Sequence, residues 1–201
     1  MTKISTLAIA AALSVAILLP AARVHAAPIL VFSNFGPNKT VDNGQYDVVS
    51  GPGENAGGGH SNYLASSFTT PTFGIFLDHI DLTISSCAPS LALGASVDLV
   101  PDDGGKPNET TATVIKHWLV TKLPCGTAKA TKLSIPSTQS LTLAGSTTYW
   151  VVVTPIGFGD FLAWSDGLMN NGNGIASQDG GQTWVHFITE AFPYSLDVWR
   201  R

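Results

Sequence analysis

The chain has 201 residues, of which only 12% are charged, and its 10 basic and 14 acidic side chains give a net charge of −4 at neutral pH. This acidic balance argues against nucleic acid, whose binding needs clustered cationic side chains. It also argues against docking on an anionic lipid surface. Gly, Ser, Thr and Asn are plentiful, which is typical of extracellular β domains and of surfaces that meet polysaccharide.

Residues 1–26 are predicted to be an export signal. Lys3 supplies a positive charge, and Leu7–Leu19 is apolar and uncharged. The apolar run is shorter than the roughly 20 residues that a membrane helix needs. We therefore expect cleavage after Ala26 or Ala27 and a secreted or extracytoplasmic mature chain with no membrane span. The alternative is an uncleaved N-terminal anchor.

The two cysteines, Cys87 and Cys125, are predicted to form a disulfide, because an even pair in an oxidising compartment is usually bonded. The chain-entropy model gives such a bond on the order of 3–4 kcal/mol of stabilisation. Two separate buried thiols are the alternative. A catalytic cysteine is disfavoured because no histidine or basic cluster lies near either one in sequence.

Short runs with strand propensity dominate residues 27–201, and no window keeps a helical period for three turns. Within 73–85, Ile80, Leu82 and Ile84 alternate with Asp81, Thr83 and Ser85. Further strands are predicted at 95–100, 111–120, 147–154, 161–165, 184–188 and 194–199. The run 147–154 is apolar on both faces and is predicted to be central in its sheet. Together these runs predict a single all-β domain, a two-sheet antiparallel β-sandwich of jelly-roll type.

The run Ser177–Trp184 fits the Ser-x-Asp-x-Gly-x-Thr-Trp pattern and resembles the Asp-box, a hairpin turn of sialidase-like propellers. Asp179 is expected to accept backbone N–H groups across the turn. Gly181 lets the chain reverse, and Thr183 and Trp184 begin the return strand. Propellers repeat the element in each blade, whereas it occurs once here. We therefore interpret it as a structural clamp.

A wider resemblance rests on seven motifs in a fixed order: Phe32–Pro37, Ala65–Thr69, Ile80–Leu82, Val97–Val100, Leu143–Val153, Ala163–Trp164 and Ser177–Trp184. This order resembles the secreted β domains of bacterial PEP-CTERM and choice-of-anchor proteins. The resemblance implies an extracytoplasmic bacterial protein with a sandwich fold, and it brings no agreed catalytic residues. The ending at Arg201 lacks the Pro-Glu-Pro-like motif, apolar helix and basic tail of the anchored members, so we do not expect surface sorting.

Four acidic residues, Asp98, Asp102, Asp103 and Glu109, lie within twelve positions and offer the oxygen ligands that Ca²⁺ prefers. Their spacing is not that of an EF-hand, and a segment rich in Asp, Asn and Gly is usually an ordinary solvated turn. Bound Ca²⁺ therefore stays an alternative to the prediction of no cofactor. No pair of histidines has zinc-ligand spacing. His60, after three glycines, is the histidine most expected to be exposed.

The five tryptophans are expected to lie mostly in the core. A sugar-binding surface needs one or two exposed, and Trp164 is the candidate if one is, with His60 as a second ligand-binding candidate. No Gly-x-Ser-x-Gly elbow is present. Glycoside cleavage needs two carboxyl groups at a set separation, and that separation is decided by the fold and not by local sequence.

The sequence therefore predicts a secreted, non-catalytic β-sandwich that acts as a binding or matrix-associated module, with polysaccharide as the favoured ligand class. A carbohydrate-active hydrolase is one alternative, and it requires a cleft with two facing carboxylates. A structural surface-layer component is the other.

Overall fold

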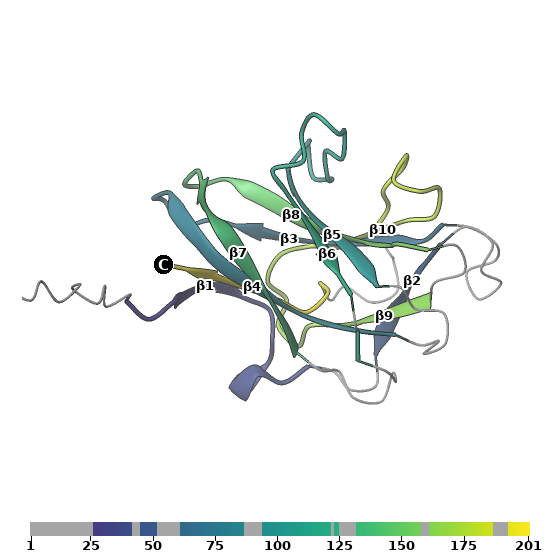
Figure 1. Ribbon diagram of the computed structural model, residues 1–201, viewed down its shortest axis with the longest axis horizontal. Helices are drawn as coiled ribbons and strands as arrows, with labels where there is room; N and C mark the ends of the chain where they lie inside the picture. Colours follow the sequence, from purple (N-terminus) through teal and green to yellow (C-terminus); the bar gives the residue numbers. More distant parts are fainter. Residues whose placement is uncertain are drawn as a thin grey trace, which may run out of the picture.

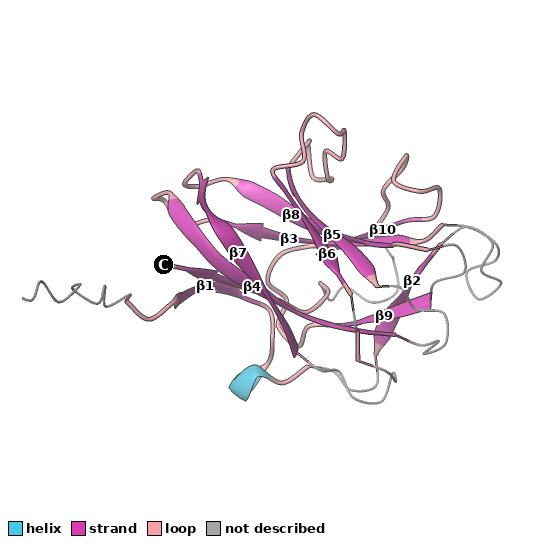
Figure 2. Cartoon of the chain, viewed as in Figure 1, coloured by secondary structure: helices cyan, strands magenta, loops and turns pink. Residues whose placement is uncertain are grey.

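The computed structural model describes residues 26–41, 45–51, 61–86, 94–121, 123–124, 132–157, 161–186 and 193–201. They form two antiparallel sheets, one of them strongly curled (Figure 1), which confirms the predicted all-β sandwich. The one helical element in these ranges is the 3-10 turn η1 (Pro37–Lys39), drawn cyan in Figure 2. Among the same residues, no helix has the length and apolar character to cross a membrane.

The six-stranded sheet is organised around β4. The strand order is β1-β11-β4-β9-β2, and β7 also pairs with β4. Its strands are β1 (Ile29–Ser33), β2 (Tyr46–Ser50), β4 (Ile75–Ser86), β7 (Lys132–Leu143), β9 (Phe161–Ser165) and β11 (Leu196–Arg200). β4 pairs with β11, β7 and β9, so one strand fixes the position of three others.

The five-stranded sheet has the order β10-β3-β8-β5-β6. Its strands are β3 (Tyr63–Thr69), β5 (Ala95–Pro101), β6 (Lys116–Val120), β8 (Thr148–Pro155) and β10 (Gly174–Ser177). β8 lies between β3 and β5, and its residues from Tyr149 to Val153 are all buried. This confirms the prediction that 147–154 is a central strand.

The main core fills the space between the sheets. Ile80, Leu82 and Ile84 face it, as the alternation predicted. Leu77 faces it as well, because the register shifts by a bulge between Leu77 and His79. Val97 and Leu99 contribute from the opposite sheet.

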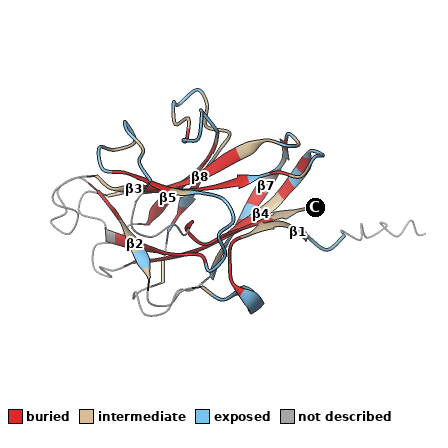
Figure 3. Cartoon of the chain, turned by 180° about the vertical axis from the view of Figure 1, so that it is seen from behind, coloured by how far each residue is buried: buried red, intermediate tan, exposed pale blue. Residues whose placement is uncertain are grey.

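Parts of the outer face of each sheet are buried as well, and the buried stretches of strand are red in Figure 3. On β8, Trp150 and Val152 alternate with the core residues and form a second apolar cluster with residues of β3, β5 and β10. On the six-stranded sheet the outer face is polar, and Asp81 and Asp197 are both 0% exposed there. Neither sheet has a face that is simply solvated.

Two predicted strands need correction. The strand expected at 111–120 begins only at Lys116, because residues 111–113 form a turn over the sheet. Residues 184–186 form no strand: Val185 makes an isolated bridge to Ala176, while 187 and 188 lie outside the described ranges. The strands β1, β2, β3, β7 and β10 were not predicted, and β7 carries Pro136 within it.

Residues 1–25, His60 and both cysteines lie outside the described ranges, so the leader and the disulfide stay predictions. The residues that precede the cysteines do lie together, however. The backbone N–H of Ser86 donates to the carbonyl of Pro124 at 2.8 Å. This contact places the two chain segments beside each other at the point where each leads into its cysteine.

We therefore expect Cys87 and Cys125 to be bonded in protein exported to an oxidising compartment. Peptide mapping without reduction is expected to recover the two cysteines in one linked species. Replacing both by Ser is expected to lower the free energy of unfolding by about 3–4 kcal/mol. Recovery of two free thiols from the exported protein would contradict the bond.

Candidate functional site

An open pocket of about 700 Å³ lies on the outer face of the five-stranded sheet, between strands β5 and β6 and the loop that joins them. Its lining comes from Asp98 on β5, from Lys116 and His117 on β6, and from Glu109, Thr111, Val114 and Ile115 on the loop. The floor is partly apolar and the other side chains are polar or charged. A volume of this size is in the usual range for small-molecule pockets.

The connecting loop is held over the sheet by Asp102. Trp150 Nε1 donates to Asp102 Oδ1 at 2.7 Å, and the backbone N–H of Gly105 donates to the same carboxylate at 3.1 Å. Farther along, the N–H of Ile115 donates to the carbonyl of Leu99 at 2.9 Å. These bonds satisfy an indole that would otherwise be buried without a partner, and they fix both ends of the loop.

Asp98 and His117 face each other across β5 and β6 as register partners. The distance from His117 Nδ1 to Asp98 Oδ1 is 2.7 Å, and Ser96 Oγ lies 3.3 Å from the same ring nitrogen. Asp98 is mostly covered, whereas the His117 side chain is 56% exposed. The pair therefore forms one rim of the pocket, with an acceptor inside and an imidazole at the surface.

Glu109 supplies the second carboxyl group of the pocket. Burial raises the pKa of Glu109 to about 7, and the negative charge of Asp98 adds to the effect. Burial likewise raises the pKa of Tyr63, with the charge of Glu109 as the second cause. Near neutral pH the Glu109 carboxyl group is therefore partly protonated and can donate as well as accept a hydrogen bond.

The turn after β10, residues 177–183, is closed by side-chain hydrogen bonds of the kind that Ser, Asp and Thr make in turns. Asp179 Oδ1 accepts the backbone N–H of Thr183 at 2.8 Å, as predicted for this aspartate, and Oδ2 accepts the Thr183 hydroxyl at 2.6 Å. Ser177 Oγ donates to Asp179 at 2.7 Å and accepts the N–H of Gly181 at 2.7 Å. The Thr183 hydroxyl is the main cause that lowers the pKa of Asp179 to about 2.

This turn also forms a wall beside Glu109. Gly181 has a φ of +89°, and a Cβ built on it would lie 2.8 Å from Glu109 Oε2 and 3.6 Å from the ring of Tyr63. Trp184, at the end of the turn, packs half-buried against the outer apolar cluster. The turn and the acidic loop, which are about 70 residues apart in sequence, therefore meet at one place.

The structure brings together only some of the acidic residues that the sequence grouped. Asp98 and Glu109 share the pocket, whereas Asp102 is bonded to Trp150 and Gly105, and Asp103 is exposed at the tip of the loop. In the described part of the chain, no group of three His, Cys, Asp or Glu residues is placed to hold a metal ion.

Trp164 is not the exposed indole. It is 0% exposed, lies 5.0 Å from the ring of Tyr194, and donates its N–H to the carbonyl of Ser195 at 3.1 Å. The core alternative is therefore correct for this residue, because β9 is flanked by β2 and β4 and its inward side chains are enclosed. His60 lies outside the described residues, so its role stays a prediction.

Sequence reasoning missed Lys116, His117 and Thr111 as pocket residues, and Tyr63 as a neighbour of the turn beside Glu109. His117 enters the site only through the register that places it opposite Asp98, and register is not visible in a single strand. Tyr63 lies at the start of a strand that was not predicted. Of the missed residues, Thr111 is the one that the sequence could have suggested, because it lies two positions after Glu109.

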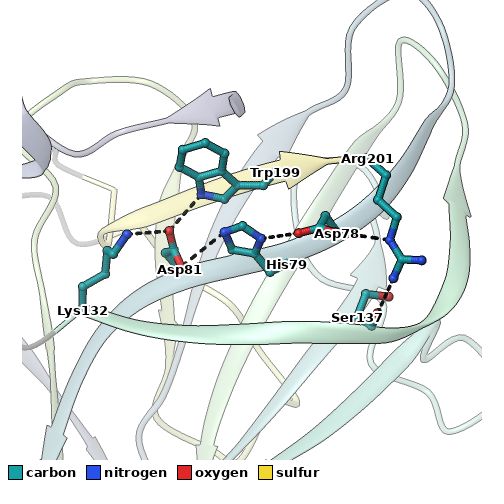
Figure 4. A network of polar contacts seen from close by, with 7 residues as sticks. All are labelled: Asp78, His79, Asp81, Lys132, Ser137, Trp199 and Arg201. Carbon is teal, nitrogen blue, oxygen red and sulfur yellow. Dashed lines mark hydrogen bonds and ion pairs between the residues drawn. The ribbon is translucent and has the colours of Figure 1, made fainter. Parts of the chain in front are cut away.

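A second polar network lies on the outer face of the six-stranded sheet (Figure 4). His79 is placed between two carboxylates: its Nδ1 lies 2.6 Å from Asp78 and its Nε2 lies 3.7 Å from Asp81. Asp81 Oδ2 accepts from Lys132 at 3.0 Å and from the Trp199 indole at 2.8 Å. These contacts join β4, β7 and β11 through side chains.

No family model, no curated protein and no solved structure matches the chain. The resemblance to PEP-CTERM and choice-of-anchor domains therefore stays a prediction from motif order.

Replacing Gly181 by Ala tests the contact between the turn and Glu109. Gly104 is the matched control, because it also has a positive φ, +66°, but nothing lies within 4 Å of a Cβ there. We expect Gly104→Ala to cost about 1 kcal/mol, the usual penalty of a left-handed residue. Gly181→Ala is expected to cost at least as much in chemical denaturation, because the Glu109 carboxyl group, at the end of a flexible side chain, must move to admit the methyl group. A smaller loss in Gly181→Ala than in Gly104→Ala would contradict a close contact between this turn and Glu109.

The raised pKa of Glu109 predicts how stability varies with pH. Between the ordinary value of 4.5 and about 7, the folded chain holds a proton that the unfolded chain has released. The free energy of unfolding is therefore expected to fall as the pH rises through this window. Glu109→Gln is expected to flatten the dependence in urea titrations, while Asp103→Asn, on the exposed tip, keeps it. An unchanged slope in Glu109→Gln would contradict the burial of this carboxyl group.

Proposed function

We propose that the protein is a secreted, non-catalytic β-sandwich module that binds the saccharide units of an extracellular polysaccharide in the pocket beside Asp98 and Glu109. The observation that carries the proposal is the pairing of two different carboxyl groups in one open pocket. Asp98 is an acceptor, and Glu109, with its pKa of about 7, can donate or accept. Sugar hydroxyls do both, so this pair matches their chemistry.

The rest of the pocket supports the same ligand class. Lys116 and His117 add donors at the rim, so the acidic and basic side chains offset each other and do not select a strongly charged ligand. Val114 and Ile115 offer apolar contact for the C–H groups of a sugar ring. The pocket is open along the sheet face, which suits a unit within a longer chain. The export signal predicted for residues 1–26 would bring the module to such polymers.

A hydrolase is the second candidate, and one specific observation favours it. A carboxyl group with a pKa near 7 beside an acceptor carboxylate is the pattern of a general acid with its partner. We favour binding because Asp98 is engaged by His117 and because the pocket is open to water. Glycoside cleavage usually gains from a water-excluding site.

The test is retention on a panel of immobilised plant and bacterial polysaccharides, followed by calorimetry with soluble oligosaccharides of any polymer that retains the protein. Asp98→Asn is expected to weaken binding about tenfold or more, since a hydrogen bond to a charged group contributes about 1.5–3 kcal/mol. Asp103→Asn is the matched control and is expected to bind as the natural chain does.

Two outcomes would change the proposal. Failure of the natural chain to bind any polymer of the panel would contradict it. Release of new reducing ends from a retained polymer, abolished by Glu109→Gln while binding persists, would replace it by the hydrolase.

A further inference from the structure

A lysine ammonium reaches a fully buried carboxylate on the outer face of the six-stranded sheet. Lys39 Nζ lies 2.7 Å from Asp197 Oδ2, and the Asp197 side chain is 0% exposed. The two residues are 158 positions apart, near opposite ends of the folded chain. This site is separate from the saccharide pocket, which lies on the other sheet.

The backbone around η1 is held in an unusual conformation that positions the amine. Asn38 and Lys39 have φ values of +58° and +61°, and neither is glycine. Two successive left-handed residues cost free energy, and such strain is kept where the surroundings impose it. The ring of Trp199 lies 4.9 Å from Lys39 Nζ and covers the ammonium on one side. Lys39 is thus directed onto one carboxylate.

A second buried carboxylate stands directly opposite the first. Asp81 on β4 is the register partner of Asp197 on β11, and its side chain is also 0% exposed. Among the described residues, Oδ1 of Asp197 and Oδ1 of Asp81 have no hydrogen-bond partner, although His79 Nε2 lies 3.7 Å from the latter. Charges buried with an unsatisfied oxygen are costly, so a reaction that removes them is favoured by the site.

We propose that Lys39 and Asp197 condense into an intramolecular isopeptide bond, favoured by the carboxylate of Asp81 that lies opposite Asp197. A proton passes from the Lys39 ammonium to Asp197 Oδ2 across their 2.7 Å contact, and the negative charge of Asp81 favours the neutral acid that results. The neutral Nζ attacks Cγ, the Nζ–Cγ bond forms, the Cγ–Oδ2 bond breaks, and the leaving oxygen takes one further proton from the amine. One ammonium and one carboxylate become one amide and one water, so no oxidant, reductant or cofactor is consumed.

The neighbouring pair Lys132 and Asp81 is similar but less suited to the reaction. Lys132 Nζ lies 3.0 Å from Asp81 Oδ2, but the same oxygen also accepts the Trp199 indole N–H at 2.8 Å. Two donors on one oxygen stabilise the carboxylate as an anion, which resists attack by an amine. Asp197 carries a shorter contact to a single amine, so the chain offers a matched control for the proposal.

Intact mass of the full chain, measured after export, denaturation and reduction, tests the bond. The natural chain is expected to be lighter than its processed sequence by one water, and a protease digest is expected to give one branched species that contains both Lys39 and Asp197. Lys39→Arg, which keeps the charge, is expected to have the full mass. Lys132→Arg is expected to keep the loss of water. Asp81→Asn, with circular dichroism to show that it is folded, is expected to lose water more slowly than the natural chain, because the charge opposite Asp197 is gone.

Three results would overturn the proposal. One is a natural chain that keeps its full mass after prolonged incubation. Another is a loss of water that persists in Lys39→Arg. The third is a loss abolished by Lys132→Arg, with a branched peptide that contains Asp81. If Lys39→Arg does not fold, the digest of the natural chain decides the matter by itself.

Discussion

The hydrogen bond between the indole of Trp150 and the carboxylate of Asp102 is the contact on which the candidate site depends. Trp150 points away from the main core, yet it is 0% exposed, and its N–H donates to Asp102 at 2.7 Å. A buried indole needs both apolar cover and a partner for its N–H. The loop after β5 provides both, and the pocket beside Asp98 and Glu109 is the space left between this loop and the sheet.

The outer face of the six-stranded sheet also holds buried groups that need polar partners, and there the buried groups are carboxylates. Its outer face buries Asp81 and Asp197, and the lysines that reach them, Lys132 and Lys39, come from β7 and from the segment after β1. Trp199 donates to one carboxylate and covers the amine of the other pair. These ion pairs and the Asp98–His117 pair therefore lie on the outer faces of the two sheets, where covering segments bring in polar groups, and the core between the sheets is apolar.

Strands that alternate or are apolar throughout could be predicted from the sequence, whereas the contacts between strands could not. The 147–154 run was apolar on both faces, which predicted a central strand and could also have predicted an outer cover. Residues 111–115 were interpreted as strand because Thr and Val favour strands, whereas they fold back over the sheet. Trp164 was the candidate for an exposed indole, but its burial depends on β2 and β4 on either side of its strand. The Asp98–His117 pair depends on register, which no local pattern encodes.

The most direct test of the covered outer face is fluorine NMR of the protein labelled with fluorotryptophan, with the Trp150 resonance assigned by Trp150→Phe. The account predicts that this resonance does not shift when H₂O is exchanged for D₂O, and that it becomes solvent-sensitive in Asp102→Ala, where the loop loses its anchor. A Trp150 resonance that is fully solvent-sensitive in the natural chain would contradict the account, because the sheet would then have no cover and the pocket no wall.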